Sequence, residues 1–129
     1  MIRISGAILA TVVAGACKAA TPLVGCPMNI VAIPLIVVTT DGSPVPGLTI
    51  SDTILRMGQV FTFPSPAAVV SRTRVIFADS LIGFIRPQGD SVRVVGTNGT
   101  VGFSANFVFD APGDCHVHKA AGPDSVTVS

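Results

Sequence analysis

The 129-residue sequence contains no Glu, no Trp and no Tyr, and only two of its residues are Lys. Glu and Lys are good helix formers, so their scarcity argues against a helical bundle. Trp and Tyr supply the usual stacking platforms for sugars and single-stranded nucleic acid, and the chain lacks both. It is rich instead in β-branched residues, with 19 Val, 11 Ile and 11 Thr, and this composition favours strands.

Charge is scarce as well. Charged residues make up 12% of the chain, with eight basic residues against seven acidic ones. This near-neutral balance gives no electrostatic footprint for nucleic acid and no polybasic surface for anionic lipid. Because 49% of the residues are hydrophobic, the chain can bury a core, which excludes intrinsic disorder. The length allows one domain.

The first sixteen residues have the pattern of a bacterial export signal. Arg3 precedes an uncharged apolar stretch that ends in Ala14-Gly15-Ala16. The stretch is too short to span a bilayer as a permanent helix, and its small residues favour cleavage after Ala16. We therefore expect a signal peptide at 1–16, a tether at 17–29 and one domain at 30–129.

Cleavage after Ala16 would leave Cys17 at the new N-terminus, and Ala14-Gly15-Ala16-Cys17 resembles the lipobox of bacterial lipoproteins. The resemblance implies acylation of Cys17, first on its sulfur and then on its amine. Two or more acyl chains anchor a protein stably, whereas one does not. Lys18 at the next position implies, by likeness to sorting in two-membrane bacteria, an outer-membrane lipoprotein facing the periplasm or the surface. The alternative is ordinary cleavage at the same bond, which releases a soluble protein.

Two further cysteines, Cys26 and Cys115, lie near opposite ends of the expected domain. Exported proteins meet oxidising conditions, in which cysteines pair. We expect a Cys26–Cys115 disulfide, which would stabilise the fold by about 4–5 kcal/mol in the chain-entropy model. Two alternatives stay open: Cys26 and Cys115 are buried thiols, or Cys17 pairs with Cys26 in an unlipidated protein.

The mature chain alternates short apolar segments with turns rich in Gly, Pro, Asn and Asp, which predicts about seven short strands. The cleanest alternation runs over 101–109, with Val and Phe on one face. Pro34 lies inside the first apolar run and marks an edge strand, a bulged strand or a strand that crosses between sheets. The run 69–77 predicts a strand with Arg72 and Arg74 on its outer side.

Two shorter segments complete the pattern. Residues 81–85 are short and apolar and predict a strand, with Gly83 as a bulge or a point of close approach. Asn98-Gly99 is the dipeptide favoured in type I′ hairpin turns. Strands and turns of this kind indicate a β-sandwich or a small barrel, and we favour an all-β, single Ig-like sandwich.

Three stretches also carry a family resemblance. Residues 36–50 join two strands through Asp41-Gly42-Ser43-Pro44-Val45-Pro46-Gly47, residues 86–94 turn into an alternating strand, and Asp114-Cys115-His116-Val117 precedes a closing strand. With these stretches, residues 30–129 resemble the carboxypeptidase regulatory-like, or transthyretin-like (prealbumin-like), β-sandwich of small bacterial lipoproteins. The resemblance implies a non-catalytic sandwich with structural, binding or interaction roles.

His116 and His118 are the candidate metal ligands. On one strand they would share a face, with Cα atoms about 6.5–7 Å apart. Zinc would need a third ligand, from Asp114 or Asp124 in a neighbouring turn. The spacing is more typical of exposed or capping histidines near a sheet edge.

The motifs give little support to catalysis. The segment 102–106 is the nearest to a G-x-S-x-G nucleophile elbow, but it lacks the final Gly and lies in the middle of a predicted strand. All seven Asp are expected at or beside turns, where Asp usually bonds its own backbone. Four arginines could gather into a modest anion-contact patch or simply form a solvated face: Arg72, Arg74, Arg86 and Arg93.

The sequence thus predicts a non-catalytic exported β-sandwich lipoprotein, a structural or interaction module of the bacterial cell envelope. Its expected partners are the membrane, through Cys17, and envelope proteins or glycans; no nucleic acid and no cofactor are expected. One alternative is a soluble secreted ligand-binding sandwich. The other is a metal-binding protein that uses His116 and His118.

Overall fold

The computed structural model describes residue 26 and residues 28–64 and 71–129 of the chain. These residues form eight β-strands and one short 3₁₀ helix, η3 (Asp79–Phe84). Three strands make the smaller sheet: β1 (Ala32–Thr39), β4 (Thr73–Ala78) and β8 (Ser125–Val128). Five strands make the larger sheet: β2 (Thr49–Ile54), β3 (Gln59–Phe63), β5 (Asp90–Thr97), β6 (Gly102–Asp110) and β7 (His118–Ala121).

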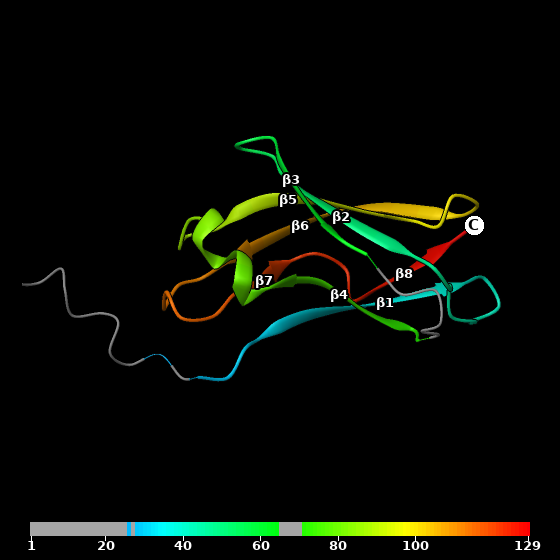
Figure 1. Cartoon of the computed structure of the whole chain (residues 1–129), viewed down its shortest axis with the longest axis horizontal. Coiled ribbons are helices and arrows are strands. Elements are labelled where there is room, and N and C mark those ends of the chain that lie inside the picture. Colours follow the sequence, from blue (N-terminus) through cyan, green and yellow to red (C-terminus); the bar gives the residue numbers. More distant parts are fainter. Residues whose placement is uncertain (1–25, 27, 65–70) are drawn as a thin grey trace, which may run out of the picture.

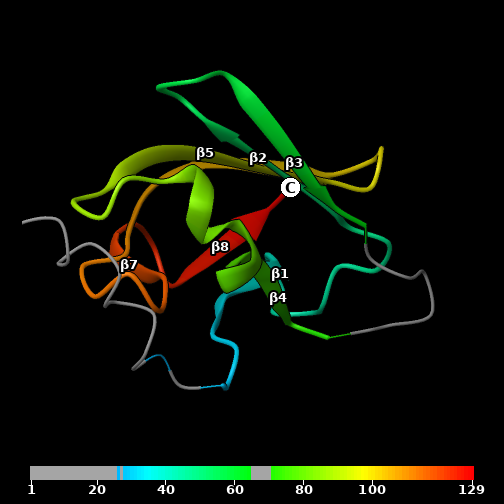
Figure 2. The ribbon, with the colours of Figure 1, turned by 60° about the vertical axis from the view of Figure 1, so that its left-hand side comes forward.

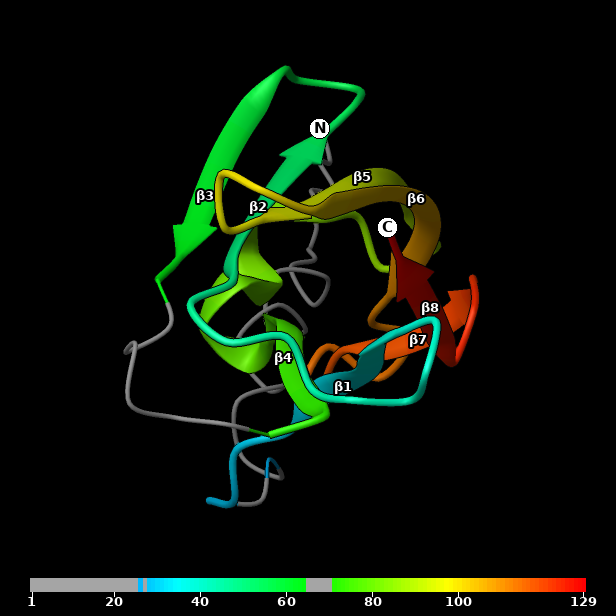
Figure 3. The same ribbon diagram turned by 90° about the vertical axis from the view of Figure 1, so that its right-hand side faces the viewer.

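The two sheets pack face to face, which confirms the predicted all-β sandwich (Figure 1). The smaller sheet has the order β4-β1-β8, and the larger has the order β3-β2-β5-β6-β7. All neighbours are antiparallel except β1 and β8, which run parallel. Figure 3 shows the larger sheet curling over the smaller one, from β3 on one side to β7 on the other.

The core lies between the sheets and is built from alternating strand residues. The alternation predicted over 101–109 is confirmed, because Phe107 and Phe109 of β6 are buried and Phe103 is partly buried on the same face. Phe77 of β4 stacks on Phe109 with ring centroids 4.5 Å apart, and Phe107 lies 5.5 Å from Phe109. Burying each such side chain contributes about 1.5–3 kcal/mol, so these rings hold the two sheets together.

Pro34 lies opposite a β-bulge, but the extra residue belongs to the partner strand β4, and β1 is the central strand of its sheet rather than the predicted edge, bulged or crossing strand. The register between β1 and β4 shifts at Ile33/Pro34, so Ile76 is an extra residue in β4 and both Ile76 and Phe77 point inward. β8 pairs with β1 only from Ile36 onward, so Pro34 lies beyond the end of β8. A residue without an N–H is tolerated there because no ladder bond is lost.

The predicted assignment of residues to the inner and outer faces of β4 is wrong. Arg74 points into the core and is 7% exposed, whereas Thr73 and Val75 point outward. The guanidinium of Arg74 donates to the carbonyl of Val45 at 2.9 Å, and this bond lets a basic side chain bury its aliphatic stem. Residues 69–70 of the predicted strand lie outside the described residues.

The predicted strand at 81–85 is also wrong, because most of this segment belongs to η3. Figure 2 shows η3 between the two sheets. Leu81 is buried, and the ring of Phe84 lies 4.8 Å from that of Phe61 on β3. Packing against the open side of the core therefore outweighs the β propensity of this apolar run.

The turn between β5 and β6 is not the predicted type I′ turn. That turn needs positive φ at both central residues, and among the described non-glycine residues only Asp114 has one. The side-chain oxygen of Asn98 instead accepts the N–H groups of Thr100 and Val101 at 2.9 and 3.0 Å. These bonds close a longer loop, in which Gly99 alone has positive φ.

Residues 1–25 lie outside the described part of the chain. The export signal at 1–16 and the acylation of Cys17 therefore stay predictions. Among the residues that the structure describes, no helix is long and apolar enough to cross a membrane.

The corner between β7 and β8 leads to a first test. Gly122 has a φ of 131°, and a Cβ on it would overlap the ring of Phe107. We expect Gly122→Ala to lower the free energy of unfolding by about 2–4 kcal/mol, from backbone strain and overpacking. Urea unfolding followed by circular dichroism measures this loss. Gly113→Ala is the matched control, because its Cβ would meet no atom within 4 Å; equal losses in both variants would contradict the packing argument.

Candidate binding site

The candidate site lies beside a disulfide that joins Cys26 and Cys115, which are 89 positions apart. Their Cα atoms are 5.3 Å apart. The structure thus contains the bond expected from the cysteine pattern. It ties the segment before β1 in the smaller sheet to the loop before β7 in the larger sheet.

Asp79, at the start of η3, reinforces the same junction. Its carboxylate accepts the N–H groups of Val31 and Val117, both at 2.8 Å, and lies 2.6 Å from Nδ1 of His116. Burial alone would raise the pKa of Asp79, but the hydrogen bonds from Val31, His116 and Val117 together lower it. One side chain therefore holds the approaches to both β1 and β7.

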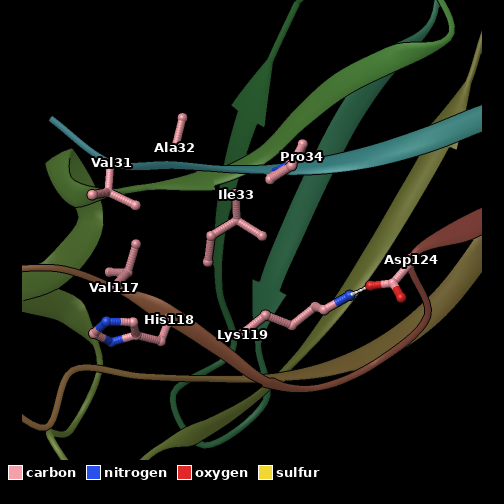
Figure 4. Close-up of a pocket in the computed structure, with 8 residues that line it drawn as sticks. All are labelled: Val31, Ala32, Ile33, Pro34, Val117, His118, Lys119 and Asp124. Atoms are coloured by element: carbon pink, nitrogen blue, oxygen red, sulfur yellow. Dashed lines mark hydrogen bonds and ion pairs between the residues drawn. The ribbon is translucent and has the colours of Figure 1, made fainter.

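A cavity of about 360 Å³ opens between β1 and β7, and we call it the β1–β7 slot. One wall is apolar, and the other end is polar (Figure 4). The slot is lined by Val31, Ala32, Ile33, Pro34, Val117, His118, Lys119 and Asp124.

The slot exists because two strands that face each other are not paired. The N–H of Ile36 donates to the carbonyl of Asp124 at 3.1 Å, and the pairing of β1 with β8 starts at this point. The earlier residues of β1 have no neighbour on that side in the described chain, and β7 is the last strand of its own sheet. An apolar group can reach both strand edges from solvent.

Lys119 and Asp124 form the polar end of the slot. Nζ of Lys119 donates to the carbonyl of Pro123 at 3.0 Å and forms an ion pair with Asp124. The side chain of Asp124 is almost fully exposed, whereas that of Lys119 is mostly covered. His118 is exposed, with its Nδ1 4.0 Å from Asp110. This end is charge-balanced and suits a neutral ligand better than an ion.

His116 and His118 do not share a strand. β7 begins at His118, and His116 lies in the preceding loop, where its ring contacts Asp79. Of the two expected third ligands, Asp124 pairs with Lys119. Within residues 26, 28–64 and 71–129, no group of three His, Cys, Asp or Glu is placed to hold a metal ion.

The four arginines do not form one patch. Arg74 is buried, Arg72 donates to the carbonyl of Gly42 at 2.8 Å, and Arg93 is exposed on the other sheet. Arg86 forms an ion pair with Asp90, and the charged cluster around Asp90 stabilises the fold.

The cluster around Asp90 includes Arg56, which the sequence patterns did not single out. Arg56 donates from Nε and Nη2 to the buried Asp90 carboxylate at 2.8 and 2.9 Å, and Arg86 adds its backbone N–H at 2.8 Å. Chiefly the hydrogen bonds from Arg56, followed by that from Arg86, hold the pKa of Asp90 down at about 2 against its burial. Asp90 thereby fixes the β2–β3 hairpin to the start of β5.

Asp52 is the exception among the acidic residues. It lies in the middle of β2, is fully buried, and neither of its side-chain oxygens has a hydrogen-bond partner among the described residues. Burial raises its pKa to about 8. The expectation that every Asp lies at a turn is wrong here, although the alternation Ile50, Asp52, Ile54 already placed this side chain on the inner face.

No protein-family model matches this chain, and the comparisons with curated proteins and with solved structures found no match. The resemblance of residues 30–129 to the transthyretin-like family therefore stays a prediction.

The orphaned carboxylate of Asp52 predicts an unusual pH dependence. Its pKa is about 8 in the folded chain against 3.8 in the unfolded one, so between these values the folded chain holds the extra proton. The free energy of unfolding should therefore fall as the pH rises toward 8, by about 1.4 kcal/mol per pH unit from this group. We expect Asp52→Asn to remove that slope, as measured by urea unfolding at pH 5 to 8. The exposed Asp124→Asn is the control, and an unchanged slope in Asp52→Asn would contradict the prediction.

The disulfide can be tested in the same way. Replacing both Cys26 and Cys115 by Ser should lower the free energy of unfolding by about 2–5 kcal/mol, because the unfolded chain loses its cross-link. Reducing the wild-type chain should reproduce this loss in the same urea titration. Cys17→Ser should leave both the stability and the disulfide unchanged. Free thiols at Cys26 and Cys115 in non-reduced mass spectrometry would contradict the pairing.

Proposed function

We propose that this protein is an exported, lipid-anchored β-sandwich that serves as a non-catalytic structural or interaction module of the bacterial cell envelope. The observation that carries the proposal is the Cys26–Cys115 disulfide. Structural disulfides persist in oxidising compartments such as the periplasm and the cell surface, and they are rare in a reducing cytosol. The bond is therefore consistent with an export signal at 1–16.

The disulfide also relates the sandwich to the anchor at Cys17. Nine peptide steps separate Cys17 from Cys26 (26 − 17), so this segment can span at most about 30 Å. An acylated Cys17 would thus keep the sandwich near the membrane surface. Lys18 supports an outer-membrane location, facing the periplasm or the surface.

A non-catalytic role is supported by how the ionisable side chains are used. Asp90 binds Arg56, Asp79 binds His116, and Lys119 binds Asp124. The first two contacts join separate loops and strands, and the third closes the β7–β8 corner. These charged side chains are therefore engaged in contacts that stabilise the fold. An interaction role is supported by the β1–β7 slot, whose apolar wall is accessible to an envelope protein or glycan.

The mature N-terminus tests the proposal. We expect an N-terminal peptide that begins at Cys17 and carries acyl chains on its sulfur and its amine, detected by mass spectrometry of the membrane fraction. Cys17→Ser, or growth with globomycin, should move the protein out of that fraction, because a lipid anchor alone would hold it there. Lys18→Arg is the matched control for retention. An unmodified Cys17 in a wild-type protein that fractionates as soluble would instead favour the secreted alternative.

A further inference from the structure

The two sheets end in four edge strands, and three of these carry features that block pairing with another strand. Inward charges, bulges and short length are the usual protections of a sheet edge. β4 has the inward-pointing Arg74 and the bulge at Ile76. β7 has four residues, among them Lys119, and a register shift against β6. β8 has only four residues.

β3 has none of these protections. Its sequence is Gln-Val-Phe-Thr-Phe, with no charge, no Pro and no Gly. Its register with β2 is continuous from Gln59 to Phe63, without a bulge. In the described chain, β3 is the outermost strand of the larger sheet and has a strand neighbour only in β2 (Figure 3). An uncharged, regular strand of β-branched and aromatic residues is the kind of edge that pairs with another strand.

Exposed apolar side chains gather around the same edge. Val60 of β3 is 56% exposed, and Leu55 and Met57 in the adjoining hairpin turn are 42% and 43% exposed. Phe84, which contacts Phe61, is 38% exposed. These are four of the eight large hydrophobic side chains that are exposed in the described residues. Such a concentration of apolar surface marks an interaction site.

We propose that β3 pairs antiparallel with β3 of a second copy of this chain, so that the two larger sheets join into one. The strand is self-complementary about a two-fold axis at Phe61. Val60 would lie opposite Thr62 of the second copy, a β-branched pair on the outer face. Phe61 would lie opposite its own counterpart, and no like charges would meet. The proposal stands on this geometry and does not depend on acylation.

The size of the contact predicts its strength. One five-residue strand with part of a hairpin is smaller than the standard specific interface, which buries about 1,200 Å² or more. We therefore expect a reversible dimer with a Kd of about 10–100 µM. Confinement at a membrane by the anchor proposed above would raise the effective concentration and favour the dimer.

Sedimentation velocity tests the proposal over a concentration series from about 1 to 500 µM, which brackets the expected Kd. The chain carries Cys17→Ser, so that neither acyl chains nor a free thiol joins two copies. We expect a concentration-dependent shift from monomer to dimer. Val60→Lys should weaken the dimer at least tenfold, because it places a charge on the pairing edge, and should leave the melting temperature unchanged because Val60 is exposed. A chain that stays monomeric throughout would overturn the proposal.

Two further variants test the place and the register of pairing. Val75→Lys puts the same charge on the outer face of β4, an edge strand that is already protected by its bulge, and should leave the dimer intact because 43% of Val75 is exposed and β4 takes no part in the pairing. The double variant Val60→Lys/Thr62→Glu should recover the dimer, because the two-fold register places each Lys opposite a Glu of the second copy. Loss of the dimer in Val75→Lys, or no recovery in the double variant, would overturn the β3–β3 pairing.

Discussion

The contact between Phe77 and Phe109 is the constraint on which the rest of the sandwich depends, because it joins a strand of the smaller sheet to a strand of the larger one inside the core. The bulge in β4 lets Phe77 point inward next to Ile76, and Pro34 is accommodated opposite that bulge. On the other side of the stack, Phe107 occupies the space that a side chain at position 122 would need. The chain therefore turns sharply at Gly122, and β8 meets β1 only halfway along. The β1–β7 slot is the gap left by this short pairing.

Two carboxylates, those of Asp79 and Asp90, hold segments together outside the strand ladders of the described chain. Asp79 connects η3 to the approaches of β1 and β7, and Asp90 connects the β2–β3 hairpin to β5. Both carboxylates are stabilised in their charged form, so acid weakens these junctions. Asp52 has the opposite preference, because it is buried without a partner. Asp79 and Asp90 therefore stabilise the fold when they are ionised, whereas Asp52 stabilises it when it is protonated.

Much of the fold could be predicted because strand faces repeat every two residues. The repeat over β6 gave its inward rings correctly, and the positions of the cysteines, with the expected export, led to Cys26–Cys115. The repeat failed in β4, where a hydrogen bond to a distant carbonyl makes it favourable to bury Arg74. The strand predicted at 81–85 rested on a short apolar run, and it was wrong because packing against the core, which forms only in the folded chain, favours the helical turn of η3.

The candidate site was harder to predict than the fold. The slot arises from a mismatch in length between β8 and β1, and no residue pattern records such a mismatch. His116 attracted attention as a metal ligand, yet its partner Asp79 lies 37 positions away, between the strands predicted at 69–77 and 81–85. Asp52 could have been found, because it occupies an inward position between two buried isoleucines. Turn propensity, a local property of Asp, gave the wrong answer there.

The disulfide has a mechanical consequence. A pull on the chain at Cys26 reaches β1 through the backbone and the loop before β7 through the covalent cross-link. The force is thus divided between the two sheets, and it does not separate β1 alone from the rest of the fold. If Cys17 carries the proposed anchor, the domain can bear tension from the membrane without unravelling from its N-terminal side.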